Sequence, residues 1–223
     1  MNWEPLILSF ELAFITTMIL LVISLPISYW LAYSNSRIKP IVETLVSMPL
    51  VLPPTVLGFY FLLAFSPTNG VGAWLESVLG IQLVFSFPGL VVASLVYSLP
   101  FMVHPLQSGL STIPQSTREA SFVLGNSRVR TLFRVLLPNI KPSLLTGIVL
   151  SFAHTIGEFG VVLMIGGNIP GKTRVASIAI YDEVEALNYD NANYYSLILF
   201  TITFLILLSV YLVNRNYQKQ YFK

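Results

Sequence analysis

Few side chains in this sequence could do chemistry. Glu158 lies near the end of a long apolar run, and two histidines, His104 and His154, lie inside such runs. Neither histidine belongs to a metal-ligand spacing, and the three residues offer no pairing of a nucleophile with a base. The chain has no cysteine, which excludes thiolate ligands and disulfides. The sequence therefore predicts no metal site, no catalytic residues and no enzyme activity of its own.

Residues 166–173 have the spacing of a phosphate-binding loop, reading Gly-Gly-Asn-Ile-Pro-Gly-Lys-Thr. That motif holds phosphate when a strand leads into the loop and a helix begins at the lysine, so that backbone N–H groups point at the anion. Here a membrane-length apolar run precedes the loop, and Pro170 removes one of the required donors. We therefore predict no nucleotide site on this chain.

Composition assigns the chain to the membrane. Hydrophobic residues make up 55% of the 223 residues and charged residues only 10%, whereas a soluble domain carries about 25% charged residues. The formal net charge of +2 is too small to favour a nucleic acid partner. The sequence thus predicts an integral membrane protein surrounded by lipid.

Five apolar runs are long enough to cross the hydrocarbon layer, which takes about 20 residues of helix. They are residues 6–33, 45–65, 90–106, 144–165 and 195–213. Because the runs are continuously apolar rather than alternating, they indicate helices and not a barrel. We expect an all-α protein in which residues 1–223 form a single transmembrane domain.

Lysine and arginine are unevenly distributed among the loops between these runs. The basic residues of the first loop, the third loop and the tail are Arg37, Lys39, Arg118, Arg128, Arg130, Arg134, Lys141, Arg215, Lys219 and Lys223. The positive-inside rule places these segments in the cytoplasm. The N-terminus is then outside and the C-terminus inside, in a multi-pass topology that only Lys172 and Arg174 of the fourth loop oppose.

The third loop has the pattern of two short helices. Ser116 and Glu119 have the spacing of a capping box, in which each side chain satisfies a backbone N–H at a helix start. Gly125 suits the left-handed residue that ends a helix, and Asn126 or Ser127 can cap the next one. We therefore expect two helices joined at an angle.

The second of these helices has an apolar side and a basic side. Its apolar residues are spaced to share one face, and they are Val129, Leu132, Phe133 and Leu136. Its basic residues are Arg128, Arg130 and Arg134. Pro138 closes the pattern, so the loop predicts a compact element that fits a groove on another protein. An ordinary amphipathic loop between spans is the alternative.

The third loop also contains a motif in three parts, Glu119-Ala120-Ser121, Gly125 and Leu137-Pro138. This motif resembles the Glu-Ala-Ala loop of the membrane subunits of ATP-binding-cassette importers, with Ser121 where the family has alanine. The resemblance implies a type I importer permease architecture, in which residues 115–138 form a coupling helix that sits in a cleft of an ATPase subunit. The residues that it assigns to ATPase coupling are Arg118, Glu119, Ala120, Ser121, Gly125, Arg128 and Pro138.

A second motif follows at the end of the fourth run, with Gly157-Glu158-Phe159-Gly160, then Gly-Asn-Ile-Pro-Gly at 167–171, then Thr173-Arg174. It resembles oxyanion importers. The Glu-Phe form with Asn-Ile-Pro-Gly is similar to molybdate permease subunits, whereas sulfate permeases more often have tyrosine after the glutamate. The resemblance implies a path for an oxyanion, molybdate first, with sulfate, thiosulfate or tungstate as alternatives. A secondary transporter fits less well, because it usually has more spans and internal repeats.

The same resemblance implies the partners of the chain. They are a second copy of the chain, a cytoplasmic ATPase dimer, and an extracytoplasmic binding protein that delivers the oxyanion. ATP and magnesium would then be bound by the ATPase, and this chain would bind no cofactor. The location implied is the bacterial inner membrane.

Several residues inside the membrane are assigned to the path or its gate. Pro53 and Pro54 interrupt the second span and Thr55 follows them, so a kinked helix either lines the path or packs inside the bundle. In the fourth span the assigned residues are Gly157, Glu158 and Gly160. A carboxylate would repel an anion, so we expect Glu158 to accept backbone hydrogen bonds or to pair with a basic side chain.

Lys172 and Arg174 are the basic residues expected at the extracytoplasmic mouth. A positive pair there would favour the approach of a doubly charged oxyanion or the docking of the binding protein. The alternative is a local salt bridge, such as one between Arg174 and Glu183.

Overall fold

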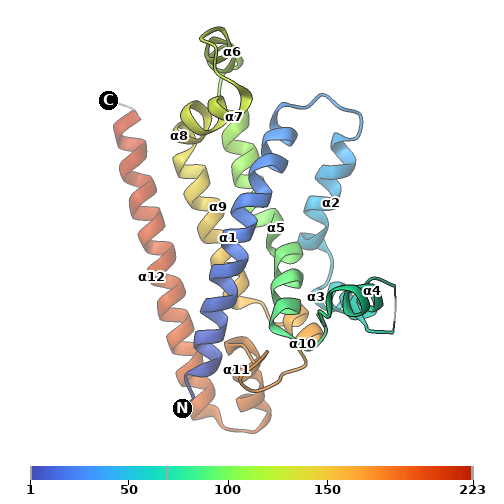
Figure 1. Cartoon of the computed structure of the whole chain (residues 1–223). Coiled ribbons are helices and arrows are strands. Elements are labelled where there is room, and N and C mark those ends of the chain that lie inside the picture. Colours follow the sequence, from blue (N-terminus) through green and yellow to red (C-terminus); the bar gives the residue numbers. More distant parts are fainter. Residues whose placement is uncertain (1, 69, 222–223) are drawn as a thin grey trace.

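The computed structural model describes residues 2–68 and 70–221 (Figure 1). Every regular element in this part of the chain is a helix. Lys223 of the predicted basic tail, together with the side chains of Arg215 and Lys219, lies outside the description. The prediction of an all-α protein is confirmed.

Three helices form the centre of the bundle, α1 (Glu4–Tyr33), α5 (Phe87–Ser111) and α9 (Lys141–Gly157). They pack against one another along their lengths (Figure 1). The buried residues of α1 recur every three or four positions and therefore share one face. Small residues allow a close approach, since a Cβ on Gly109 of α5 would lie 2.5 Å from the hydroxyl of Ser143 on α9.

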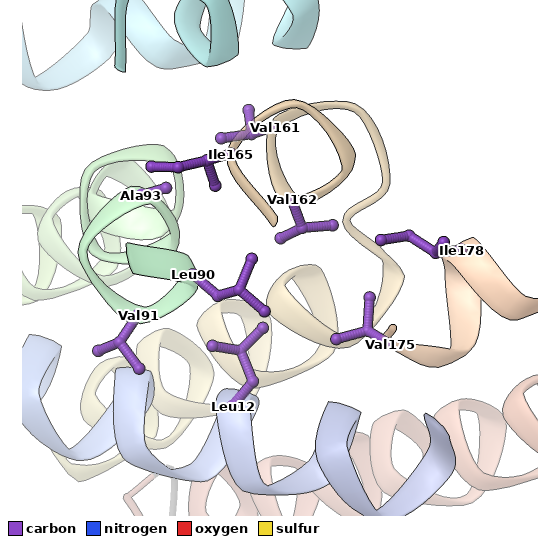
Figure 2. Close-up of a cluster of buried hydrophobic side chains, with 9 residues drawn as sticks. All are labelled: Leu12, Leu90, Val91, Ala93, Val161, Val162, Ile165, Val175 and Ile178. Carbon is purple, nitrogen blue, oxygen red and sulfur yellow. The ribbon is translucent and has the colours of Figure 1, made fainter. Parts of the chain in front are cut away.

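Two of the four clusters of buried apolar side chains in the described residues hold the central helices together. Figure 2 shows the first, in which Leu12 of α1 and Leu90 of α5 point toward each other, with Val162 of the short helix α10 (Gly160–Gly166) nearby. The second cluster joins α1 and α5 to the third loop through Leu136, which is fully buried. The third loop is thus anchored in the core and not merely tethered to it.

The second predicted span is interrupted at Pro53 and Pro54, as the sequence predicts, and the interruption is a sharp bend and not a slight kink. α2 (Lys39–Val51) and α3 (Pro54–Phe65) meet at a bend of 112°. Pro53 has no backbone N–H and restricts the residue before it, and both Leu52 and Pro53 are extended. α2 is about 20 Å long, which is too short to cross a hydrocarbon layer of about 30 Å alone. After α3 comes another short helix, α4 (Gly70–Leu79).

The fourth predicted span is also discontinuous. α9 ends at Gly157 and α10 begins at Gly160, with Glu158 and Phe159 in the break. The apolar run at 144–165 thus contains most of α9 and most of α10, and the sequence analysis did not predict the break between them. α9 also begins with a bend of 85° from the helices of the third loop.

The last span, predicted at 195–213, lies within α12 (Tyr189–Tyr221), which follows α11 (Ala176–Glu185). The hydroxyl of Tyr195 donates to the carbonyl of Asn2 over 2.6 Å, so α12 starts beside the beginning of the chain. The third loop lies at the opposite end of the bundle (Figure 1). The exposed apolar side chains of α12 include Leu197, Phe200, Phe204 and Leu208.

The number of spans agrees with the prediction of about five. Within the described residues, α1, α5 and α12 are each long and apolar enough to cross a membrane. The number reaches five if α2 with α3, and residues 128–139 of the third loop with α9, are each counted as one span. The chain is therefore an integral membrane protein with three to five candidate spans among the described residues.

Candidate functional site

The third loop folds into four short helical elements that we call the docking element. They are α6 (Gln115–Val123), α7 (Arg128–Thr131), the π-helical turn η1 (Leu132–Leu136) and α8 (Leu137–Asn139). The element projects from one end of the bundle (Figure 1). Two helices joined at a turn were predicted, and the additional π-helical turn was not.

Gly125 ends α6 in the left-handed conformation that the sequence predicts, with φ +80°. Its N–H donates to the carbonyl of Phe122 over 2.9 Å, and the N–H of Asn126 donates to the carbonyl of Ser121 over 3.1 Å. These two bonds are the Schellman pattern, which satisfies carbonyls that a helix end leaves free. The turn between α6 and α7 is thereby fixed.

The two predicted caps have different outcomes. Ser127 caps α7 by accepting a hydrogen bond from the N–H of Arg130 over 3.2 Å, as expected. The capping box of Ser116 and Glu119 is wrong, because α6 already begins at Gln115 and Ser116 lies inside its first turn. The carboxylate of Glu119 instead accepts from the side-chain amide of Gln115 over 2.6 Å.

Ser121, which departs from the family's alanine, joins the two halves of the docking element. Its hydroxyl is hydrogen-bonded to the hydroxyl of Thr131 over 2.9 Å and accepts from the side-chain amide of Asn126 over 3.2 Å. Ser121 is only 4% exposed. Sequence reasoning missed this network, although a serine that replaces alanine next to a glycine turn was a signal that could have pointed to it.

The predicted single apolar face divides into two. Leu132 and Leu136 pack inward, whereas Val129 is 66% exposed and Phe133 is 56% exposed. The π-helical turn has more residues per turn than an α-helix and so shifts the register that the prediction assumed. The exposed apolar side chains of the docking element, which we call the apolar tip, are Phe122, Val123, Leu124, Val129 and Phe133.

The arginines also differ in their surroundings. The guanidinium of Arg118 stacks over the ring of Tyr33 at 4.1 Å from its centroid, so Arg118 faces α1. Arg128 is exposed, and together with Arg118 and Tyr33 it lines a hollow between the docking element and α1. Arg130 and Arg134 are also exposed. Of the remaining predicted coupling residues, Ala120 is exposed and Pro138 is half-buried.

The second predicted site lies where the broken spans meet. A Cβ on Gly160 of α10 would lie 2.7 Å from the Cβ of Pro54 on α3, and one on Gly58 would lie 2.6 Å from the Cβ of Met164. The fold therefore brings Pro54 and Gly160 together, as the assignment to one site requires. Pro53 and Thr55 are exposed, and a Cβ on Gly157 would meet no other atom within 4 Å.

Glu158 is buried in the break between α9 and α10. Its carboxyl oxygen Oε1 accepts a hydrogen bond from the N–H of Val161 over 2.8 Å, in the first turn of α10. Its backbone carbonyl accepts from the hydroxyl of Ser177 over 2.6 Å. Glu158 thus caps a half-helix, which agrees with the expectation that it accepts backbone hydrogen bonds.

At the predicted mouth, Arg174 is held in a local network. Its Nη2 lies 3.3 Å from a carboxylate oxygen of Asp182, and its Nε donates to the side chain of Asn168 over 2.7 Å. The salt bridge suggested from sequence therefore exists with Asp182 and not with Glu183. Lys172 is exposed and has no ion pair among the described residues.

The loop with the spacing of a phosphate-binding loop is closed by its own side chains. The hydroxyl of Thr173 donates to the carbonyl of Gly166 over 2.7 Å and accepts from the N–H of Ile169 over 2.9 Å. Thr173 is fully buried, and α10 rather than a strand leads into the loop. The hydroxyl that a phosphate loop directs at a magnesium ion is occupied here.

Sequence reasoning missed a polar contact between α2 and α5. The amide of Gln107 donates to a carboxylate oxygen of Glu43 over 2.7 Å, and Ser47 is hydrogen-bonded to His104 over 3.1 Å. The signal was the spacing of polar residues at one helical turn on each of two apolar runs. Glu43 and Ser47 also line a groove of about 530 Å³ along α2.

Broken membrane helices that meet inside a bundle are typical of transport proteins, and a projecting docking element indicates a subunit that works with a partner. The comparison with known families agrees with this class. The chain belongs to the family described as the binding-protein-dependent transport system inner membrane component, which matches residues 24–223.

Relatives with described roles cover most of the chain. It is 46% identical over 209 residues to the molybdenum transport system permease protein ModB of Azotobacter vinelandii, covering 93% of this chain and 92% of ModB. It is 33% identical to the putative molybdenum transport system permease protein YvgM of Bacillus subtilis, covering 92% of this chain and 90% of YvgM. The sulfate transport system permease protein CysT of Synechocystis is 34% identical, covering 79% of this chain and 62% of CysT.

Solved structures share the fold. The inward-facing methionine transporter MetNI matches with a TM-score of 0.72 at 18% identity, covering 95% of this chain and 94% of that chain. A bacterial alginate transporter in complex with its alginate-bound periplasmic protein matches with a TM-score of 0.77 at 17% identity, covering 97% of this chain and 79% of that chain. The architecture is that of type I importer permeases, as the docking motif predicts.

Proposed function

We propose that the chain is the membrane-spanning subunit of an ATP-driven importer, and that its cargo is the molybdate anion. The observation that carries the proposal is the docking element, a rigid projection closed by Gly125 that exposes apolar side chains at one end of the bundle. The choice of molybdate is supported by the two relatives named for molybdenum transport, at 46% and 33% identity.

The apolar tip is the surface proposed to enter a cleft of the partner ATPase. Burying apolar surface contributes about 25 cal/mol per Å², so a partner that covers these side chains stabilises the complex. The turn at Gly125 and the bond between Ser121 and Thr131 make the element rigid enough to transmit a movement. Leu136 connects it to the core, and α8 leads directly into α9.

The path is proposed to run between two copies of the chain, along the broken spans. α3 and α10 contact each other where both helices are interrupted, and the groove along α2 continues toward the end that carries the docking element. In this arrangement the docking element is cytoplasmic and the N-terminus is outside, in the inner membrane of a bacterium. A binding protein would deliver the anion at the end near Lys172, and ATP with magnesium would be bound by the ATPase.

Sulfate is the second candidate cargo, because a sulfate permease is also a relative. It is supported less, since this chain spans only 62% of the length of CysT from Synechocystis. Tungstate has the same charge and tetrahedral shape as molybdate, so the bound anion is best stated as a group 6 oxyanion with molybdate first.

The test is uptake into proteoliposomes that contain this chain, its ATPase and its binding protein, with ATP inside. We expect ATP-dependent accumulation of radioactive molybdate, competition by tungstate, and weak competition by sulfate. A variant that replaces Val123 and Leu124 with serine should lose ATPase association, whereas the same change at Leu197 on α12 should keep it. Accumulation of sulfate in preference to molybdate would refute the cargo, and ATPase association that survives at the altered tip would refute the docking surface.

A further inference from the structure

A hollow of about 330 Å³ lies where the docking element meets the end of α1. Its floor is aromatic. Tyr33 is fixed by donating its hydroxyl to the carbonyl of Leu110 over 2.8 Å, and the ring of Tyr29 meets it edge to face at 5.1 Å. The guanidinium of Arg118 lies over Tyr33, and Arg128 approaches from α7. The hollow is thus lined by two arginines, one of them stacked on the aromatic floor, and it borders the apolar tip at Phe122.

These two arginines lack a carboxylate partner among the described residues. The ion pairs found there are Lys39 with Glu43 and Arg174 with Asp182, and no acidic residue lines the hollow. A guanidinium that stacks on a ring keeps the N–H groups of its edge free to donate. That geometry suits a phosphate group, which arginine binds through paired hydrogen bonds. The hollow therefore favours a phosphate-bearing ligand.

A separate apolar groove of about 340 Å³ lies beside the hollow along α1. It is lined by Pro26, Ile27, Trp30 and Val42, and Trp30 also lines the hollow. Pro26 and Ile27 precede Trp30 by about one helical turn, so the groove extends from Trp30 toward the middle of the membrane. The cationic hollow suits the phosphate headgroup of a phospholipid, and the apolar groove suits one of its acyl chains. A free phosphate ion would use only the hollow.

We propose that this site binds one anionic phospholipid of the cytoplasmic leaflet, with the phosphate between Arg118 and Arg128 and an acyl chain in the groove between α1 and α2. The cytoplasmic leaflet carries such lipids, and basic pockets at its surface attract them. The bound lipid would brace the docking element against α1. The proposal rests on the cytoplasmic position of the docking element and is independent of the transported anion.

The proposal changes the role of two residues that sequence motifs assign to ATPase coupling. Arg118 and Arg128 line the hollow, whereas the exposed Arg130 and Arg134 lie on the same element, carry the same charge and do not line it. The second pair is therefore a matched control for the first.

Trp30 provides a direct measurement. Replacing Trp3 and Trp74, both more than half exposed, with phenylalanine leaves Trp30 as the single tryptophan. The full chain is placed in nanodiscs of phosphatidylcholine that contain increasing amounts of brominated phosphatidylglycerol or brominated phosphatidylcholine. We expect brominated phosphatidylglycerol to half-quench Trp30 at an about tenfold lower lipid fraction than brominated phosphatidylcholine does. One or two charge-assisted hydrogen bonds to the phosphate imply a difference of this size. Equal quenching by both lipids would overturn the proposal.

Variants and competitors separate the remaining explanations. Arg118→Gln with Arg128→Gln should remove the preference for the anionic lipid, whereas Arg130→Gln with Arg134→Gln should keep it. Ile27→Phe fills the groove without touching the arginines and should also weaken the preference. Equal effects of the two arginine pairs, or an unchanged preference in Ile27→Phe, would contradict the proposed site.

Adding inorganic phosphate tests whether the ligand is a lipid or a free anion, and adding the ATPase tests whether the hollow belongs to the ATPase interface. Inorganic phosphate at millimolar concentration should leave the preference unchanged, and its loss would show that a free anion is the ligand. A saturating concentration of the partner ATPase should also leave the preference for anionic lipid unchanged. Loss of this preference would assign the hollow to the ATPase interface. Labelling that places the docking element outside the cell would separately refute the orientation on which both proposals depend.

Discussion

Replacing Gly125 with valine is expected to lower both uptake and the ATP hydrolysis that is coupled to it, without preventing membrane insertion. Gly125 has φ +80°, and a Cβ there would meet no other atom within 4 Å, so the whole penalty is in the backbone. The left-handed conformation costs an L-residue about 1–2 kcal/mol. If the turn relaxes instead, its two hydrogen bonds are lost, at about 0.5–1.5 kcal/mol each. Either way the docking element is destabilised by roughly 1–3 kcal/mol.

Gly80 offers a matched control for this change. It has φ +64°, a Cβ there would also meet nothing within 4 Å, and it follows α4, away from the docking element. The assay compares molybdate-dependent ATP hydrolysis and uptake in proteoliposomes with the ATPase and binding protein. We expect both to fall in Gly125→Val, to persist in Gly80→Val, and to return largely in Gly125→Asn, because asparagine tolerates the left-handed conformation. Equal behaviour of the two valine variants would refute the reasoning.

Glu158→Gln is expected to support near-parental uptake, because its amide oxygen can still accept a hydrogen bond from the N–H of Val161. Glu158→Ala removes this cap and should lower the free energy of unfolding by about 0.5–2 kcal/mol. Equal loss in both variants would show that the charge is required. In whole cells, an impermeant thiol reagent should label a cysteine placed at Asn188 and spare one at Ser127, and the reverse pattern would invert the topology. Lys172→Gln should slow uptake at limiting molybdate and reduce its dependence on ionic strength, whereas Arg174→Gln should chiefly destabilise the loop, since its charge is already paired with Asp182. Unchanged uptake in Lys172→Gln would exclude an electrostatic role at the mouth.

Features that depend on a few neighbouring residues could be predicted from the sequence. The turn at Gly125, and Ser127 as one of two candidate caps, could be predicted because a helix end has local chemistry, and the prediction of about five spans followed from the apolar runs and agrees with the upper count. The predicted capping box is wrong because the helix starts directly after Pro114, upstream of Ser116. Pro114 and Ser116 are both signals of a helix start, and their spacing does not show which one is used.

Features that depend on tertiary structure could not be predicted. The prolines at 53 and 54 indicate a kink, but the bend of 112° depends on α3 finding its place against α10. The partner of Arg174 is Asp182 because Asn168 holds both side chains, which no sequence spacing reveals. The hollow under Arg118 likewise forms only when α1 and the docking element come together.

The cap on α10 has a consequence for how quickly an anion can leave the proposed path. The N–H groups at the start of a half-helix would otherwise attract and hold an oxyanion. At α10 one of these groups is already bonded to the carboxyl group of Glu158, which lies in the same position that an anion would take. Because residence time grows about tenfold for each 1.4 kcal/mol of binding, a strong site halfway along the path would slow every turnover. If the path runs past α10 as proposed, the carboxyl group of Glu158 competes with the cargo for this N–H group and keeps this point of the path from becoming a trap.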